Sequence, residues 1–390
     1  MALDWKEILL TETKEERRLI RRFDCGVTVH RQNRSLIVIP PTMDWRAVSS
    51  GSFNGGFMSS PSAAFNTTSL GGHAQNDLMF KPREVHEKYS MMCAELVDLD
   101  PSTSIGLGTA AHMDNAALGS RLCDGIEICA AITGGIRGNG GRAGDPASYD
   151  EMERNMERSG TIVIILSIDA SLSDDAMLGA MMTATEAKSK ALLKVMGRSL
   201  YSTGIATGSG TDQVVVLCNK GSDKKVSGHR NDSKLADAIR DCVEVTLAEA
   251  LDRQSMMNSH TQCNPYVLIS RYRIAEKDCH DEIVYPFTMR ALRKGVEELS
   301  RDSRVAAIVS TALHVMDEVG WGLISKEVGD SACRQILISS LRGPSMDDPI
   351  LSKRMRSLVE PVDLLRMFMA MLLFDRAHAM EDRQSQGVAT

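Results

Sequence analysis

Glycine and polar side chains are concentrated in residues 130–145, AAITGGIRGNGGRAGD, a segment that contains six glycines. The apolar run that precedes it, from Ile126 to Ile132, predicts a buried strand that ends in this loop. Glycine permits positive φ values and close approach to a ligand, and we expect both from these glycines. Asn139, Arg142 and Asp145 add an amide, a guanidinium and a carboxylate. The pattern favours a binding loop, with a long surface turn as the alternative.

A second glycine-rich segment, GIATGSGTD at residues 204–212, is the expected partner of the first. It ends in Asp212 and leads into the apolar run VVVLC, which predicts a strand. Two loops of this composition, each next to a buried strand, are more specific together than either is alone. We therefore expect them to lie on either side of one ligand.

The elements that must position these loops alternate between strand and helix. Residues 160–170, GTIVIILSIDA, are apolar at nearly every position, as in a strand that is covered on both faces. The next segment predicts a helix with Ser171 or Ser173 as its N-cap and Gly197 at its end. Strand, helix, loop and strand together predict an α/β fold in which a mixed sheet is layered with helices.

The two ends of the chain predict further elements. Residues 1–22 have the composition of a charged amphipathic helix, and residues 26–40 that of a β-hairpin. We place a domain boundary after the α/β domain of residues 1–258. Residues 259–390 predict a mainly helical region of unknown role, and its expected helices are 282–299, 305–319, 331–341 and 362–376.

Composition limits the class of partner. The 390 residues carry a formal net charge of -6, which argues against nucleic acid as a partner. No apolar run is long enough to span a bilayer, and the charged first residues do not resemble a signal peptide. The nine cysteines include no CxxC pair and indicate reduced thiols. We expect a cytoplasmic protein without membrane association, for which a homo-oligomer is one of the open options.

Several motifs resemble those of the adenosylcobinamide amidohydrolases, enzymes of corrinoid salvage. They follow in the family's order over residues 25–230: PPTMDWRAVSS, FNGG, GNGGRAGDPASY, SGTIVIILSIDASLSDDAM, TATEAKSKAL and YSTGIATGSGTDQVVV. The resemblance implies hydrolysis of the amide between a corrin propionyl side chain and 1-amino-2-propanol. It implies a corrinoid substrate, the product adenosylcobyric acid, and no required cofactor.

A fainter resemblance concerns the order of the strand at 160–168, the helix after it and the strand after Asp212. This order is similar to the core of ornithine acetyltransferases and self-cleaving aminopeptidases, which have a layered α/β sandwich and an N-terminal nucleophile. That likeness implies an acyltransferase or aminopeptidase, with Thr109 in GLGTAA as nucleophile. The structural alternative for Thr109 is a capping residue after a strand. A third reading is a corrinoid-binding protein without catalysis.

Amide hydrolysis without a metal requires a nucleophile, donors for the oxyanion and an acid for the leaving amine. We expect backbone N–H groups at 138–141 and 208–210 to act as donors, together with Asn139. No HExxH motif or histidine pair with metal spacing occurs, and we expect no metal in the site.

Three carboxylates are candidates for the general base or acid, and each has a structural alternative. Asp145 is also suited to capping a turn, Asp212 to fixing its own loop, and Glu186 to an i,i+4 ion pair with Lys190. Arg142 is a candidate to bind the amide oxygen or to form a structural ion pair. The loops and the FNGG motif supply the candidate substrate-binding residues: Asn54, Gly55, Gly56, Gly140, Gly141, Arg142, Thr207, Gly208, Gly210 and Thr211.

Overall fold

In a computed structural model, the chain forms two compact units, residues 1–258 and 259–390. The structure describes residues 4–70, 78, 83–147, 160–228, 230–283 and 285–385.

The first unit contains two mixed β-sheets. The first sheet has the order β1-β2-β3-β6-β7, with strands Arg18–Arg22, Thr28–Gln32, Ser35–Ile39, Ala63–Thr68 and Ser104–Thr109. The second has the order β5-β4-β14-β11-β9-β8, with strands Gly56–Ser59, Trp45–Ser49, Gln213–Asn219, Thr161–Ile168, Ile126–Gly135 and Ala117–Cys123. The pairs β6–β7 and β11–β14 are parallel, and the other neighbours are antiparallel. Two short ladders join β10 (Gly140–Gly141) to β13 (Gly208–Ser209), antiparallel, and β12 (Ser171–Leu172) to β15 (Lys225–Val226), parallel.

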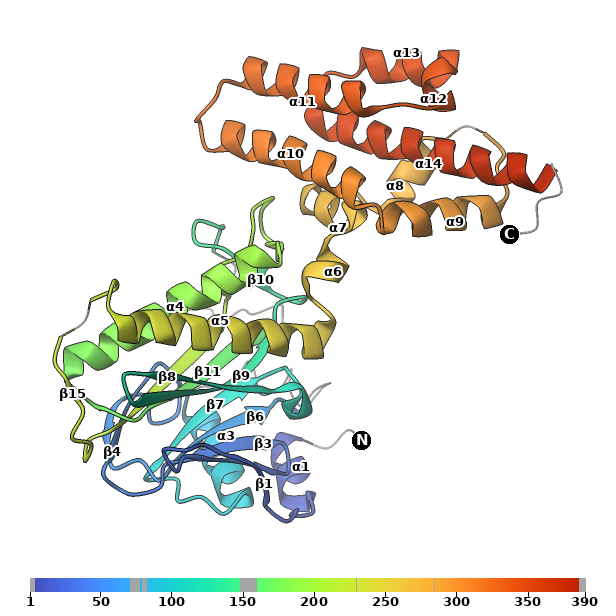
Figure 1. The fold of residues 1–390 in the computed structure, drawn as a ribbon. Coiled ribbons are helices and arrows are strands. Elements are labelled where there is room, and N and C mark those ends of the chain that lie inside the picture. Colours follow the sequence, from blue (N-terminus) through green and yellow to red (C-terminus); the bar gives the residue numbers. More distant parts are fainter. Residues whose placement is uncertain are drawn as a thin grey trace. The chain divides into compact units, whose positions relative to one another are not determined.

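Helices cover the outer face of each sheet, which gives four layers (Figure 1). Helices α4 (Asp174–Lys194) and α5 (Lys234–Ser255) lie on the second sheet, and α1 (Trp5–Thr11) and α3 (Arg83–Leu96) pack with the first. The short 3₁₀ turn η1 spans Met113–Asn115. The expected α/β fold with mixed sheets layered with helices is confirmed.

Strand β11 shows why its sequence is apolar throughout. Ile164 and Leu166 belong to the core under α4 and α5, whereas Val163 and Ile165 belong to the core between the two sheets. Successive side chains of a strand point to opposite faces, so a strand with a core on both sides must be apolar at every position. All eight residues of β11 are buried.

The amino-terminal prediction is wrong in part. Only Trp5–Thr11 is helical, and Arg18–Arg22 forms the edge strand β1, which pairs antiparallel with β2. All five residues of β1 are exposed, so no apolar face marks it as a strand. The backbone partner supplied by β2 decides its structure. The hairpin expected at 26–40 is confirmed as β2 and β3.

The second unit is helical, as expected. Its helices are α6 (Ser259–Gln262), α7 (Pro265–Ile269), η2 (Ser270–Tyr272), α8 (Glu276–Asp281), α9 (Met289–Ser300), α10 (Ser303–Gly320), α11 (Lys326–Ser340), α12 (Pro344–Asp347), α13 (Pro349–Ser357) and α14 (Pro361–Ser385). The helix expected from residue 282 begins only at Met289, because Pro286 interrupts the segment and Thr288 provides the N-cap. Among the described residues, no helix is both long enough and apolar enough to cross a membrane.

The core of the first unit can be tested at Leu166, which is fully buried. We expect Leu166→Ala to lower the free energy of unfolding by about 2–5 kcal/mol, since it removes apolar contact and leaves a cavity. The matched control is Leu122→Ala at a residue that is 74% exposed, with an expected change within about 0.5 kcal/mol. Urea unfolding followed by tryptophan fluorescence in a Trp321→Phe background measures this unit, because the two remaining tryptophans, Trp5 and Trp45, are buried in it. Equal effects of the two substitutions would contradict the assigned core.

Candidate active site

The structure brings the two glycine-rich segments together. Strand β10 (Gly140–Gly141) pairs antiparallel with β13 (Gly208–Ser209), with Gly140 opposite Ser209 and Gly141 opposite Gly208. The N–H of Thr207 also donates to the carbonyl of Gly141 at 2.9 Å. We call residues 139–145 and 207–212 the loop pair.

The glycines of the loop pair serve close packing more than positive φ. Of the glycines expected to take positive φ, Gly144 does so, at 93°, whereas Gly140 and Gly141 do not. A Cβ at Gly140 would lie 2.9 Å from two backbone oxygens. A Cβ at Gly208 would overlap the carboxylate of Asp212 and lie 2.7 Å from Nζ of Lys188. Glycine is needed at these positions because the chains approach too closely for a side chain.

Two side-chain donors converge on the carbonyl oxygen of Gly160, just before β11. They are Nδ2 of Asn139 at 2.6 Å and Oγ1 of Thr211 at 2.7 Å. Oγ of Ser209 lies 3.2 Å from the same oxygen, but its single proton is directed to the nearer carboxylate of Asp212 at 2.5 Å. Asn139 is only 2% exposed, and one N–H of its amide is used in the bond to Gly160. Its position therefore favours clamping of the loop pair onto β11 over donation to an oxyanion.

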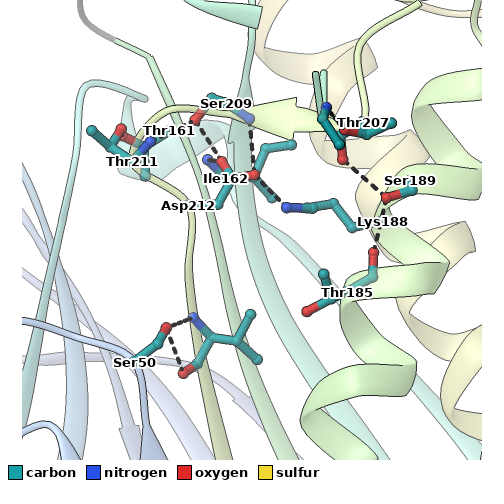
Figure 2. A network of polar contacts seen from close by, with 12 residues as sticks. Ser50, Thr161, Ile162, Thr185, Lys188, Ser189, Thr207, Ser209, Thr211 and Asp212 are labelled. Atoms are coloured by element: carbon teal, nitrogen blue, oxygen red, sulfur yellow. Dashed lines mark hydrogen bonds and ion pairs between the residues drawn. The ribbon is translucent and has the colours of Figure 1, made fainter. Parts of the chain in front are cut away.

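The carboxylate of Asp212 receives four hydrogen bonds (Figure 2). Oδ1 accepts from the N–H of Ile162 at 2.9 Å and from the hydroxyl of Ser209 at 2.5 Å. Oδ2 accepts from the ammonium of Lys188 at 2.5 Å and from the N–H of Ser209 at 2.9 Å. A carboxylate has about four lone-pair sites, so these donors occupy all of them. The side chains of Lys188 and Asp212 are 10% and 9% exposed.

Sequence reasoning missed Lys188 and Ser209. Lys188 extends from the buried face of α4 to Asp212, as Figure 2 shows. The signal for it was a lysine in register with Met177, Met181 and Ala184 on the apolar face of a helix, where an unpaired charge is costly. Ser209 offered no signal in the sequence beyond its place among glycines. It is half-buried, between the buried carboxylate and the exposed Gly210.

Asp145 stabilises its own loop through hydrogen bonds to its carboxylate. Its Oδ2 accepts from the N–H of Arg142 at 2.8 Å and from the hydroxyl of Ser199 at 2.6 Å. Burial alone would raise the pKa of Asp145. Hydrogen bonds from Ser199, Ser202 and the backbone N–H of Arg142, together with the positive charge of Arg142, outweigh this effect. They hold the pKa of Asp145 below its ordinary value. A lowered pKa and a turn-capping geometry favour a structural role.

Arg142 and Thr207 also support the loop pair. A Cβ at Gly204 would overlap the Arg142 side chain, so that side chain lies against the backbone of the second segment. Oγ1 of Thr207 accepts the N–H of Ala143 at 3.2 Å, and Ser189 of α4 donates to the carbonyl of Thr207 at 3.0 Å.

Glu186 lies apart from the loop pair. It is exposed on α4, and its carboxylate accepts from Nδ2 of Asn231 at 2.9 Å. The i,i+4 partner considered for it, Lys190, pairs with Glu244 at 2.7 Å instead.

The residues of the FNGG motif form a turn before β5. Nδ2 of Asn54 donates to the carbonyl oxygens of Pro101 and Ser104, both at 2.7 Å. Asn54 and Gly56 have positive φ values of 54° and 86°, and a Cβ at Gly55 would overlap the carbonyl of Gly51. These contacts tie the turn to the start of β7. The structure does not bring Asn54, Gly55 and Gly56 into contact with the loop pair within the described residues.

Thr109 ends β7, near the start of β14. The side chain of Gln213 contacts the backbone N–H and carbonyl of Gly108, both at 3.4 Å, and Ser50 exchanges hydrogen bonds with Val214 (Figure 2). Thr109 is 5% exposed, and its hydroxyl accepts the N–H of Ala111 at 3.1 Å. In this contact Thr109 caps the turn after a strand, which is the structural role that the sequence offered as the alternative to a nucleophile.

Each unit has a cleft that lies away from the loop pair. One of about 480 Å³ is bordered by Arg18, Arg31, Asp114 and Arg253, and one of about 570 Å³ lies in the helical unit around Asp302. Neither is lined by a residue of the loop pair. Convergent donors and a buried ion pair are more specific than concavity, so we place the candidate site at the loop pair.

Comparison with known proteins relates the first unit to one family. The family model described as adenosylcobinamide amidohydrolase matches residues 21–259. An uncharacterized protein of Methanocaldococcus jannaschii is 35% identical over 161 residues, which cover 38% of this chain and 62% of that protein. The chain therefore spans less than two thirds of the length of this relative.

Two solved structures have low similarity. A Pyrococcus horikoshii protein matches 62% of this chain and 82% of its own, with 15% identity and a TM-score of 0.28. A Burkholderia beta-aminopeptidase matches 63% of this chain and 82% of its own, with 10% identity and a TM-score of 0.26.

The close packing at Gly208 gives a testable contrast with Gly210. We expect Gly208→Ala to lower the free energy of unfolding by about 1–3 kcal/mol, because the added Cβ displaces Lys188 or Asp212. The matched control Gly210→Ala should change it by less than about 0.5 kcal/mol, since a Cβ there meets no atom of the described part of the chain within 4 Å. Urea unfolding measures both. If the two variants were equally stable, the tight contact at Gly208 would be refuted.

The lowered pKa of Asp145 predicts a pH-dependent contribution to stability. A carboxyl with a lower pKa in the folded state stabilises it above the unfolded-state pKa of about 3.9, and the contribution is lost as pH falls through the folded-state pKa. Asp145→Asn should therefore be less stable than wild type at pH 7. The difference should shrink as pH falls from about 5 toward 3. Thermal unfolding at each pH measures it, and a difference independent of pH would contradict the assigned contacts.

Proposed function

Because the chain belongs to the adenosylcobinamide amidohydrolase family, we propose that it hydrolyses the amide that joins 1-amino-2-propanol to a corrin propionyl side chain. The products are adenosylcobyric acid and 1-amino-2-propanol, and the reaction serves corrinoid salvage. The substrate is a corrinoid small molecule, and no further cofactor is required. The match over residues 21–259 is the observation that carries this proposal.

We place the reaction at the loop pair, with Ser209 as nucleophile. Every lone-pair site of Asp212 is occupied, so a water molecule cannot approach this carboxylate without displacing a donor. Two of the four donors are backbone N–H groups, which do not transfer protons in this chemistry. The hydroxyl of Ser209 is a donor of the type that becomes a nucleophile when its proton passes to an adjacent base.

The exposure of neighbouring residues supports this assignment. Asp212 and Lys188 are buried, Gly210 is exposed, and Ser209 lies between them. Among the described residues, a Cβ at Gly210 would meet no atom within 4 Å, so Gly210, next to Ser209 in the chain, has free space on its side-chain face. A bulky substrate can reach the hydroxyl there without reaching the carboxylate.

In the proposed reaction, the carboxylate of Asp212 receives and returns each proton. Oγ of Ser209 attacks the amide carbon, and its proton passes to Oδ1 of Asp212. The C–N bond breaks, and the departing nitrogen takes this proton as 1-amino-2-propanol leaves. Water then attacks the ester on Ser209, its proton passes through Asp212 back to Oγ, and the carboxylic acid is released. Lys188 acts as a positioning residue, because its ammonium fixes the carboxylate that receives the proton.

The oxyanion requires donors other than those already used. The N–H of Gly140 donates to Ile136 at 2.8 Å, and the N–H of Ser209 donates to Asp212. Two of the backbone donors expected from the sequence are thus engaged. The backbone of Gly210, directly after Ser209, borders the open space, and we propose its N–H as an oxyanion donor.

The assay with adenosylcobinamide tests the activity. We expect the full chain to release 1-amino-2-propanol and adenosylcobyric acid, both detected by mass spectrometry. Ser209→Ala should lower kcat by at least about 10²-fold, because it removes the attacking group. The matched control is Ser189→Ala, which removes a hydroxyl from the same network without contacting Asp212, and its kcat should change by only a few fold.

A covalent intermediate separates a nucleophile from a structural serine. Acid quenching during turnover should reveal a full-length chain heavier by one cobyric acyl group, with the added mass on the peptide that contains Ser209. A chain cleaved before Thr109, or loss of turnover in Thr109→Ala alone, would instead support the alternative related to self-cleaving aminopeptidases. If the chain bound adenosylcobinamide but released no 1-amino-2-propanol, the result would support the third hypothesis, a corrinoid-binding protein without catalysis.

A further inference from the structure

Three side chains of metal-ligand type meet in the first unit, away from the loop pair. They are Cys25, in the turn between β1 and β2, and Glu127 and Cys129, on β9. One ligand atom from each residue lies within 4.8 Å of the others. Glu127 and Cys129 share a face of β9 because they are two residues apart in a strand.

The spacing of the two sulfurs fits a bridging metal. Sγ of Cys25 lies 3.8 Å from Sγ of Cys129, although the residues are 104 positions apart in the sequence. A tetrahedral zinc with Zn–S bonds of about 2.3 Å holds two sulfurs about 3.8 Å apart. A disulfide needs an S–S distance of about 2.05 Å, so the thiols would have to move closer to form one.

Glu127 is held in place as the third ligand. Its Oε2 accepts the backbone N–H of Cys25 at 2.6 Å, and the residue is 9% exposed. A carboxylate has lone pairs on both oxygens, so it can keep this bond and bind a cation. Cys129 is buried at 2% exposure and Cys25 is half-buried, which leaves a solvent-facing side for a fourth, water ligand.

We propose that Cys25, Cys129 and Glu127 bind one zinc ion that links the β1–β2 turn of the first sheet to β9 of the second. Two thiolates and one carboxylate are ligands that zinc accepts in tetrahedral sites. Cys129 lies six residues before Gly135, where the strand ends in the loop that leads to the loop pair, about 20 Å along the strand. The site is therefore remote from Ser209, and the proposal is independent of the proposed hydrolysis.

Zinc titration of the full chain tests the site. The protein is freed of metal with a chelator, kept reduced, and titrated with Zn²⁺ in competition with a chromophoric chelator. We expect one tight site per chain. Cys25→Ser and Cys129→Ser should each weaken binding by more than the 10–100-fold typical of losing an outer-shell partner, and Glu127→Gln should weaken it at least tenfold. The matched control Cys263→Ser changes an exposed thiol and should leave the affinity unchanged.

Two measurements on the wild-type chain keep the test independent of variant folding. Co²⁺ in place of zinc should give thiolate-to-metal charge-transfer absorption and the visible bands of a tetrahedral site. Zinc should also raise the unfolding temperature of the first unit while leaving the kcat for amide hydrolysis unchanged. The proposal is overturned if the reduced wild-type chain binds no more zinc than a double variant with both Cys25→Ser and Cys129→Ser. It is also overturned if the cobalt spectrum lacks the thiolate band, or if the two thiols form only a disulfide.

Discussion

The carboxylate of Asp212 joins parts of the first unit that are distant in the sequence. Ile162 brings the start of β11 to it, Lys188 brings α4, and Ser209 brings the second glycine-rich segment. The ion pair is buried, and removal of one partner from such a pair typically costs about 3–5 kcal/mol because the other charge stays uncompensated. Gly208 follows from this constraint, since a side chain there would occupy the space that Lys188 and Asp212 need. The glycine at 208 is thus a consequence of the ion pair that it packs against.

The two stacked sheets determine where chemistry can occur. Strands β9, β11 and β14 have helices on one side and the first sheet on the other, so their middles contain only packed side chains. A polar side chain inside either core needs a partner, as Nδ2 of Asn66 in β6 has in Oγ1 of Thr133 in β9 at 2.9 Å, because an unpaired polar group there would be costly. At one end of β9 and β11 lie Gly160 and the loop pair. At the other end of β9, Glu127 and Cys129 meet Cys25 of the first sheet.

Local patterns in the sequence predicted most of the fold. The uninterrupted apolar run of β11, the helical segment of α4, and the hairpin of β2 and β3 each carry their own signal, and the structure has them. The ends of α4 differ from the prediction: Ser173 is the N-cap residue but makes no side-chain capping hydrogen bond, and the helix ends at Lys194, where Met196 and not Gly197 takes the left-handed conformation. Residues 18–22 gave the wrong element because the strand exists through its pairing with β2 and buries no face. The site was harder to predict for the same reason. That Lys188 reaches Asp212, or that Cys25 lies against Cys129, depends on contacts between residues far apart in the chain. Composition and spacing do not encode such contacts.

The arrangement around Ser209 also explains how a buried base and a large substrate can act together under the proposed mechanism. A carboxylate that contacted the corrinoid directly would have to be exposed, and water would then weaken its interaction with the ammonium of Lys188. In this structure the carboxylate stays buried, and one hydroxyl carries its effect to the surface at the exposed Gly210. Ser209 and Gly210 are small, and a Cβ at Gly210 would meet no atom of the described residues within 4 Å. Glycine therefore has two functions in this loop pair. On the inner side it lets Lys188 approach Asp212, and on the outer side it keeps the approach to Ser209 open.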